Sequence, residues 1–527
     1  MTRAGAGALV LIALAAGLAL RLARLDLQPM HNDEANQAVK FGALLERGEY
    51  RYDAHDHHGP TLYYLSLPAA WMRGQTTFAS LDEYTLRGVT ALFGAATILL
   101  LPLLSSALGR TAVGSGAVLA ALSPALVFYS RMFIQEALFA CFTLAFVIAL
   151  GRLATGSGLA WAAWAGVAAG LAGATKETSV IVLPAALVAC AIAWWSLSPS
   201  QRPVRSGGHW RTASLLGLST AAAVAALFYS SFFAHPEGVL APFQAARTYL
   251  DRGVDPGSHA HPWHFYFGLL TYSSTGGLKW SEGLVLGLAV AGAMTAWRWP
   301  RSPSRTLADT TPRDRVFWTR YFTANVVIVA ALFSAIPYKT PWNLMPFYIG
   351  MTVLAGIGFA ALLRATSSRV MRGALVGAFV IASGQLGWQA WRASVVYASD
   401  PRNPYVYAHT VPDAVRMATR IRDLAALHPD GADMQVSVIA PPHEQWPLPW
   451  YLRTLPHVGY WAAPGDALAL RAPVIVVSTD HAEALDGALG DRYVSEFYGL
   501  RAEVLLTLYI ERSLWERFLS RVAESGA

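Results

Sequence analysis

The sequence predicts a polytopic α-helical membrane protein with a C-terminal α/β domain, and three observations carry this prediction. Of the 527 residues, 54% are apolar and only 14% are charged, whereas soluble domains are about 25% charged. Runs without Asp, Glu, Lys or Arg recur along the first three quarters of the chain. From residue 398 onward the composition becomes that of a soluble domain. An ordinary soluble enzyme and a disordered chain are excluded, and no nucleic-acid partner is expected.

The uncharged runs predict about 11 transmembrane helices within residues 1–397. A helix needs about 20 predominantly apolar residues to cross the hydrocarbon core of a bilayer. The runs cover residues 4–20, 88–108, 111–130, 137–151, 153–175, 178–197, 212–234, 283–297, 321–338, 340–363 and 373–391. The first run is followed by Arg21 and Arg24 rather than by a small-residue cleavage site, so we expect an uncleaved first helix.

The arginine distribution predicts the orientation in the membrane. With a cytoplasmic N-terminus, the arginine-rich loops 198–211, 298–316 and 364–372 all fall inside, as the positive-inside rule requires. An odd number of spans then places loop 21–87 and the C-terminal domain on the outer face. We therefore expect an integral cell-membrane protein whose chemistry lies outside the cytoplasm.

Residues 398–527 predict a small extracytoplasmic α/β domain. A helical pattern over residues 412–427 precedes short apolar runs at 434–440, 473–478 and 503–510, with Gly, Pro and Asp between them. Such short apolar segments between turn residues are typical of strands. We expect a mixed sheet with at least one helix.

The first outer loop carries the candidate catalytic residues. Asn32 or Asp33 can cap a helix that ends at Gly48. A carboxylate in the first turn of a helix is favoured in its ionised form, which suits a general base. Asp33 is placed in this way; the alternative, more common for an Asn-Asp-Glu sequence before a helix, is that it serves only as a cap. On a helix, the side chain of Glu34 points about 100° away from that of Asp33. We therefore expect a different role for Glu34, in positioning or metal binding.

A second polar cluster in this loop, at residues 53–58, could bind a divalent metal ion as a cofactor. Its candidate ligands are Glu34, His57 and His58, because histidine and carboxylate are ordinary zinc ligands. The spacing matches no tight zinc signature. The alternative is a hydrogen-bonded, water-facing site. The aromatic run 59–71, which includes Tyr63, follows and predicts a second interfacial helix.

Several of these stretches together resemble a known superfamily. They are the uncleaved first helix, the outer Asp33-Glu34 pair, the Gly-Pro-x-x-Tyr-Tyr run at 59–64 and the Thr-Lys-Glu at 175–177. This combination resembles the GT-C glycosyltransferases of the protein-mannosyltransferase type. The stretches at 338–343, 400–410 and 493–500 resemble, more narrowly, the flippase-activity-associated family.

The resemblance implies a sugar donor carried on a polyprenyl phosphate and maps the catalytic base onto Asp33. The departing lipid phosphate needs cations, and Arg131, Lys176 and Lys339 are the candidates at outer span ends. Each could instead be a snorkelling interfacial residue. Glu136 is expected to pair with Arg131 or to hold the acceptor. Glu177, His57, His58 and Tyr63 complete the predicted substrate-binding set.

The predicted function is therefore transfer of a sugar, with inversion, to an outer-face acceptor that is a glycan, a lipid or a protein. No Asp-x-Asp sequence and no glycine-rich phosphate loop occur in the chain, which argues against a nucleotide-sugar donor. The alternative is a non-enzymatic flippase, or a flippase-associated protein, for lipid-linked sugars. Such a transporter is expected to have pseudo-symmetric halves and broken helices near the midplane of the membrane, and the sequence indicates neither.

Overall fold

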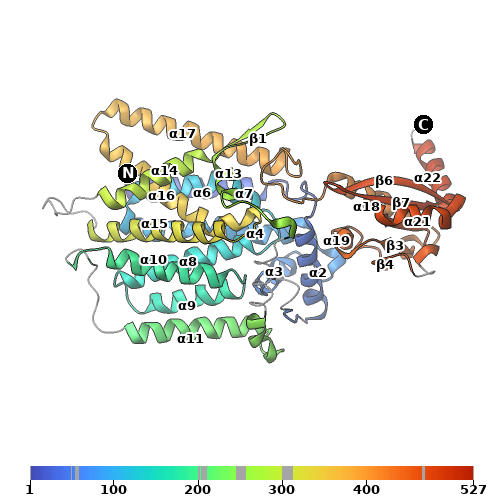
Figure 1. Cartoon of the computed structure of the whole chain (residues 1–527), viewed down its shortest axis with the longest axis horizontal. Helices are drawn as coiled ribbons and strands as arrows, with labels where there is room; N and C mark the ends of the chain where they lie inside the picture. Colours follow the sequence, from blue (N-terminus) through green and yellow to red (C-terminus); the bar gives the residue numbers. More distant parts are fainter. Residues whose placement is uncertain are drawn as a thin grey trace.

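The protein consists of a helical bundle with an α/β module at one end (Figure 1). The computed structural model describes residues 2–48, 50–53, 58–199, 202, 210–244, 257–298, 312–465 and 469–525. The bundle contains the predicted membrane helices. The N-terminus of α1 (Arg3–Leu22) lies at the end of the bundle opposite the α/β module (Figure 1).

All eleven predicted runs form helices in the bundle. In the described residues, seven helical segments are long and apolar enough to cross a membrane: Arg3–Leu22, Glu83–Leu108, Glu136–Ala154, Trp210–Tyr229, Asp314–Ala335, Pro341–Ala365 and Arg369–Val396. An eighth candidate is the pair α6 (Arg110–Leu122) and α7 (Pro124–Ser130), which is bent by 57°. Three shorter apolar helices fill the remaining places: α9 (Ala160–Gly173), α10 (Ser179–Trp195) and α14 (Gly283–Arg298).

Glycines allow the central helices to approach one another closely. A Cβ atom at Gly356 on α16 (Met345–Ala365) would lie 2.1 Å from the carbonyl oxygen of Ala112 on α6. A Cβ atom at Gly358 would lie 2.0 Å from the carbonyl oxygen of Leu288 on α14. Small residues at such positions are typical of helix packing in membranes, where close backbone contact supplies much of the attraction.

Two helices of the first outer loop lie at the end of the bundle nearest the α/β module (Figure 1). The first, α2 (Asn32–Arg47), ends as predicted at Gly48, whose φ of 68° is left-handed and suits glycine. Its start differs from the prediction, because the side chain of His31 caps it rather than Asn32 or Asp33. The second, α3 (Thr61–Met72), lies where the aromatic run 59–71 predicted a helix.

The C-terminal module, residues 398–525, contains a five-stranded mixed sheet in the order β4-β3-β5-β7-β6. The predicted helix is α18 (Pro412–Ala425), and the three predicted strands are β3 (Val436–Ile439), β5 (Val474–Ser478) and β7 (Val504–Glu511). Strands β3, β4 and β5 run parallel, and β7 is antiparallel to both β5 and β6. The remaining helices are α19 (Pro442–Gln445), α20 (Leu448–Tyr451), α21 (Thr479–Leu489) and α22 (Arg512–Ser525).

The prediction missed the two edge strands, β4 (Val458–Trp461) and β6 (Tyr493–Arg501). All four residues of β4 are only half-buried, and β6 mixes buried, half-buried and exposed positions. Edge strands have one unpaired side and bury less apolar surface. Their sequences therefore lack the continuous apolar run that marks the central strands.

Candidate active site

A cavity of about 1420 Å³ brings several predicted site residues together. One part of its lining is polar and comes from α2, from residue 58 and from the segments around residues 135, 176 and 343. It includes Asp33, Gln37, His58, Gln135, Glu136, Lys176, Glu177 and Asn343. The rest is mainly apolar and comes from α10, from α11 (Trp210–Tyr229) and from α15 (Pro312–Ala335). The cavity therefore suits a molecule with a polar head and an apolar tail.

Asp33 lies in the first turn of α2 and lines this cavity. Its backbone N–H donates to Nδ1 of His31 at 3.1 Å. Its side chain is 41% exposed, so the carboxylate is accessible. The positive end of the helix dipole stabilises a negative charge at this position.

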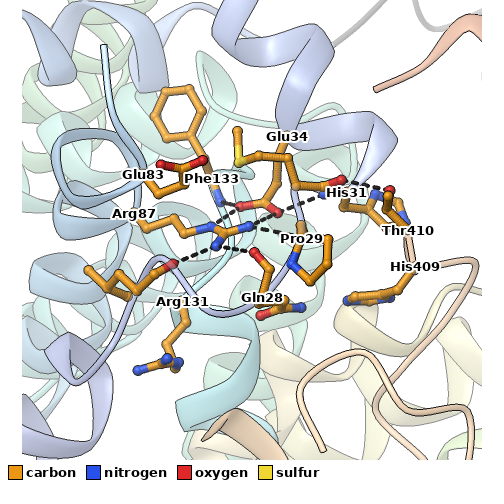
Figure 2. Close-up of polar contacts among 12 residues, drawn as sticks. Gln28, Pro29, His31, Glu34, Glu83, Arg87, Arg131, Phe133, His409 and Thr410 are labelled. Atoms are coloured by element: carbon orange, nitrogen blue, oxygen red, sulfur yellow. Dashed lines mark hydrogen bonds and ion pairs between the residues drawn. The ribbon is translucent and has the colours of Figure 1, made fainter. Parts of the chain in front are cut away.

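Glu34, the residue after Asp33, lies among Arg87, Phe133 and His31 (Figure 2). Its side chain is fully buried, and Arg87 binds both carboxylate oxygens, from Nε and Nη2, at 2.7 Å. The backbone N–H groups of Phe133 and His31 also donate to these oxygens, at 2.7 and 3.0 Å. Arg87 in turn donates to the carbonyl oxygens of residues 25, 28 and 29.

The Glu34–Arg87 pair therefore holds the chain segment that leads into α2. Glu34 is not among the described residues that line the cavity. Of the two candidate catalytic residues of this loop, Asp33 thus lines the cavity and Glu34 does not. The contacts of Glu34 with Arg87 and with two backbone N–H groups fit the positioning role that the sequence suggested.

Lys176 binds two polar residues of the cavity wall. Its Nζ donates to Oε1 of Glu136 at 2.5 Å and to Oδ1 of Asn343 at 2.8 Å. The lysine and the glutamate are both buried, and a buried charge is stable only with such partners. Glu136 therefore pairs with Lys176, not with Arg131 as one of our alternatives proposed.

His58 and Glu177 form a second pair on the cavity wall. Nδ1 of His58 lies 2.7 Å from Oε2 of Glu177, and the hydroxyl of Tyr52 donates to Oε1 at 3.1 Å. Burial raises the pKa of Glu177, but the charge on His58 and the hydrogen bonds from His58 and Tyr52 outweigh it, so the pKa is lowered. Glu177 is therefore an anion that orients His58.

Tyr63 lies behind the cavity wall rather than on it. Its buried hydroxyl donates to Oε1 of Gln37, which also accepts from Nε2 of Gln135 at 3.0 Å. Gln37 and Gln135 both line the cavity, whereas Tyr63 is not among the described residues that do. Tyr63 thus supports the wall, which corrects the expectation that it contacts the substrate.

Two of the three cations expected to bind the lipid phosphate, Arg131 and Lys339, bind other groups. Arg131 donates to the carbonyl oxygens of Leu20, Arg21, Ala23 and Arg24 at the end of α1 and to that of Ser394, and its guanidinium points away from the Glu34–Arg87 pair (Figure 2). Lys339 donates through Nζ to the carbonyl oxygens of His261 and Ile336. Neither is among the described residues that line the cavity. Both cations satisfy carbonyl groups instead.

The candidate metal ligands are not assembled in the described part of the chain. Both oxygens of Glu34 are occupied by Arg87 and backbone N–H groups, and His58 belongs to the separate Glu177 pair. His57 lies outside the described residues. Within the described ranges, no group of three His, Cys, Asp or Glu side chains could hold a metal ion. The two described candidates, Glu34 and His58, therefore belong to separate side-chain pairs.

Sequence reasoning missed three polar residues of the cavity, although two signals pointed to them. Gln37 follows Asp33 by four residues, and this spacing places both on one face of a helix. Asn343 ends the stretch 338–343, and Gln135 directly precedes Glu136. Neutral amide side chains close in sequence to charged candidates are therefore also candidates for the lining of the site.

Comparisons with known proteins agree with this architecture. The sequence model of the family described as dolichyl-phosphate-mannose-protein mannosyltransferase matches residues 11–235. No protein of curated function matches the chain in sequence.

Solved structures match nearly the whole chain. The crystal structure of ArnT from Cupriavidus metallidurans bound to undecaprenyl phosphate is 16% identical, with a TM-score of 0.61 over 96% of this chain and 98% of ArnT. The apo form of ArnT gives 14% identity and a TM-score of 0.63 over 97% and 99% of the two chains. The Archaeoglobus fulgidus oligosaccharyltransferase tethered with an acceptor peptide is 12% identical in sequence. It gives a TM-score of 0.57 over 95% of this chain and 74% of that chain.

These likenesses extend over the bundle and the C-terminal module together. The chain therefore has the fold of the GT-C glycosyltransferases, and its residues 11–235 match the protein-mannosyltransferase family in sequence.

Proposed function

We propose that the protein is a membrane glycosyltransferase that moves a sugar from a polyprenyl-phosphate donor to the hydroxyl group of an acceptor. One observation carries this proposal. A single cavity is lined by the accessible carboxylate of Asp33, by the side chains of Lys176 and His58, and by an apolar wall from α10, α11 and α15. A base, a phosphate site and a lipid site are the three parts that this reaction needs.

Asp33 is the general base of the proposed reaction. It accepts the proton of the acceptor hydroxyl as the oxygen attacks the anomeric carbon of the sugar. The bond between this carbon and the phosphate oxygen breaks, and the polyprenyl phosphate leaves with the electron pair. Attack from the side opposite the phosphate inverts the anomeric configuration. No second carboxylic acid is needed, because the leaving phosphate is already an anion.

Lys176 and His58 stabilise the leaving phosphate. Glu136 and Asn343 take two of the three N–H groups of Lys176, and a third group suffices for a phosphate oxygen. His58 is held in the cavity wall by Glu177, whose Oε2 lies 2.7 Å from its Nδ1, and its ring is placed to donate a hydrogen bond to the phosphate. Cations placed where negative charge develops are a major source of catalysis.

The polyprenyl chain of the donor fits the apolar part of the cavity. This wall includes Val188 of α10 and Leu332 of α15, which are 51% and 42% exposed. Side chains with such exposure are open to the lipid of a surrounding bilayer. The likeness to ArnT bound to undecaprenyl phosphate, and to the archaeal oligosaccharyltransferase AglB in complex with dolichol-phosphate, supports a donor of this class.

The orientation of the chain follows from the positive-inside rule. We place the N-terminus and the arginine-rich loops in the cytoplasm, and the cavity and the C-terminal module on the outer face of the cell membrane. The acceptor is then an outer-face glycan, lipid or protein. A nucleotide sugar has no access to this side.

A transfer assay with purified protein tests the proposal. A synthetic polyprenyl-phosphate donor with a radiolabelled sugar is mixed with cell-envelope fractions of the source organism, which supply acceptors. We expect the label to move from the lipid to the acceptor with the wild type, and transfer to fall at least about 100-fold with Asp33→Asn. Asp26→Asn is the matched control, because Asp26 lies in the same loop and binds the hydroxyl of Tyr84 instead.

Two results of this assay would contradict the proposal. Equal transfer by the wild type and Asp33→Asn would remove Asp33 from the mechanism. Movement of the intact lipid-linked sugar across proteoliposomes, without transfer, would identify a flippase instead.

A further inference from the structure

The cap of α2 is a histidine, which is unusual for this position. Asn, Asp and Ser are the common residues there, because a short side-chain oxygen accepts the free backbone N–H groups of the first turn. Here Nδ1 of His31 accepts the backbone N–H of Asp33 at 3.1 Å. The same Nδ1 lies 3.7 Å from Oδ2 of Asp33. The imidazole is therefore next to both the backbone and the carboxylate of the proposed base.

The second nitrogen of His31 binds the C-terminal module. Nε2 lies 3.1 Å from the carbonyl oxygen of Tyr407. Because Nδ1 accepts a hydrogen bond, Nε2 carries the proton and donates to this carbonyl. His31 is 98% buried, and its ring makes edge-type contacts with Trp342 and His409, with centroid distances of 5.6 and 4.9 Å. Both nitrogens are thus hydrogen-bonded and two aromatic rings pack against the imidazole, so it has one orientation.

The residue before His31 is held by the same module. The backbone N–H of Met30 donates to the hydroxyl of Tyr451 at 2.7 Å, and its carbonyl oxygen accepts from the hydroxyl of Thr410 at 2.7 Å. Figure 2 shows Thr410 and His409 beside His31. Three hydrogen bonds from the C-terminal module therefore fix the two residues that lead into the first turn of α2.

We propose that His31 is the positioning residue of the active site, and that through it the C-terminal module sets the position of Asp33. The inference rests on the proposed role of Asp33 as base. The bond to Nδ1 fixes the first turn of α2, and the bond from Nε2 fixes the imidazole against the module. A base displaced by about 1 Å reduces the rate on the order of 100-fold. The module thus contributes to catalysis without touching the substrate.

Two substitutions of His31 separate positioning from packing. His31→Phe keeps an aromatic ring but loses both hydrogen bonds, and His31→Asn restores an oxygen that can cap α2. We expect His31→Phe to lower kcat about 30-fold with little change in KM for the donor. We expect His31→Asn to recover kcat to within about fivefold of the wild type.

The chain offers a matched control at His428. Nδ1 of His428 accepts the backbone N–H of Asp430 at 3.2 Å and lies 3.6 Å from Oδ2 of that residue. The local geometry is the same as at His31 and Asp33, but it occurs just after α18, in the C-terminal module. His428→Phe should leave both kcat and KM unchanged.

Tyr451→Phe tests the module side of the link. It removes the hydroxyl that accepts the backbone N–H of Met30. We expect kcat to fall about threefold to tenfold, again with an unchanged KM for the donor. A thermal melt and binding of the polyprenyl-phosphate donor show that each variant is folded.

The results that overturn this inference differ from those that overturn the proposed function. If Asp33→Asn abolishes transfer while folded His31→Phe keeps the wild-type kcat, His31 does not position the base. If His31→Asn is as slow as His31→Phe, the cap is not the cause. If Asp33→Asn itself retains transfer, the proposed function fails first.

Discussion

Arg21 caps the end of α6, and Arg131 caps the end of α1, the helix that carries Arg21. Arg21 of α1 donates to the carbonyl oxygens of Ala120 and Ala121 at the end of α6, at 3.1 Å each. Arg131, just after α7, donates to carbonyl oxygens at the end of α1, including that of Leu20 at 2.9 Å. In the described part of the chain, neither guanidinium lies within ion-pair distance of a carboxylate. The negative ends of the helix dipoles of α6 and α1, with their free carbonyl groups, stabilise the two positive charges in place of carboxylates.

This relationship predicts that Arg131 contributes to stability rather than to donor binding. Arg131→Met leaves several buried carbonyl groups without a donor and should lower the free energy of unfolding by about 3 kcal/mol. KM for the donor should stay unchanged, whereas Lys176→Met should raise it at least tenfold. Thermal melts in detergent and donor titrations measure the two quantities. A raised KM with an unchanged melting temperature for Arg131→Met would return this residue to the phosphate site.

The buried pair of Glu34 and Arg87 predicts a strong energetic coupling. Glu34→Gln leaves the guanidinium of Arg87 without its counter-charge and should cost about 3–5 kcal/mol of stability. The double variant Glu34→Leu with Arg87→Met should lose less than the sum of the losses of Glu34→Leu alone and Arg87→Met alone, because no buried charge remains unpaired; these three variants and the wild type form the cycle. Denaturant unfolding of the four proteins measures this cycle. Additive losses would show that the two side chains act independently.

The pKa of His409 predicts how stability depends on pH. Burial lowers this pKa well below its ordinary value, and the positive charge on Arg87 lowers it further. Below about pH 6.5 the unfolded chain therefore binds a proton that the folded protein does not. The free energy of unfolding should fall with decreasing pH, by up to about 1.4 kcal/mol per unit.

Thermal melts of the wild type and His409→Asn between pH 7.5 and 5 check this dependence. The difference in stability between the two proteins should shrink or change sign as the pH falls, because the variant has no imidazole to protonate. A constant difference in stability across this range would contradict the prediction, because it would mean that His409 binds a proton equally in the folded and unfolded chains.

The apolar wall of the cavity predicts a dependence on the length of the donor lipid. Val188→Asn places an amide beside the proposed polyprenyl chain, at a cost of about 1 kcal/mol. KM should rise about fivefold for a long-chain donor and stay constant for a short-chain one. Val380→Asn on α17 (Arg369–Trp391) is the control, because Val380 is 62% exposed and is not among the described residues of the cavity. An equal effect on both donors would exclude this wall as the lipid site.

The helices were predictable because apolar runs without charges have few alternatives in a chain of this composition. The individual site residues were only partly predictable. Asp33, Glu136 and Lys176 line one cavity, and the first-turn position and the Thr-Lys-Glu stretch had indicated two of them. Their meeting depends on how loop 175–178 packs against residues 59–61, through contacts such as the hydrogen bond from the backbone N–H of Gly59 to Thr175.

The roles of Arg131 and Glu34 could not be read from the sequence. A charge at a span end has the same sequence context whether it binds a phosphate, as we expected for Arg131, or a helix terminus, as the structure shows. Arg87 follows Glu34 by 53 residues, so no local pattern marks their pairing. The cap by His31 was missed for another reason, since propensity favours the neighbouring Asn32.

Single-turnover transfer by Asp33→Asn tests the central claim most directly. The variant and the wild type are each loaded with the radiolabelled polyprenyl-phosphate donor, and the acceptor fraction is then added. We predict that both proteins bind the donor equally well, and that the variant transfers the sugar at least about 100-fold more slowly. Equal rates of transfer from equally loaded proteins would contradict the assignment of Asp33 as the base.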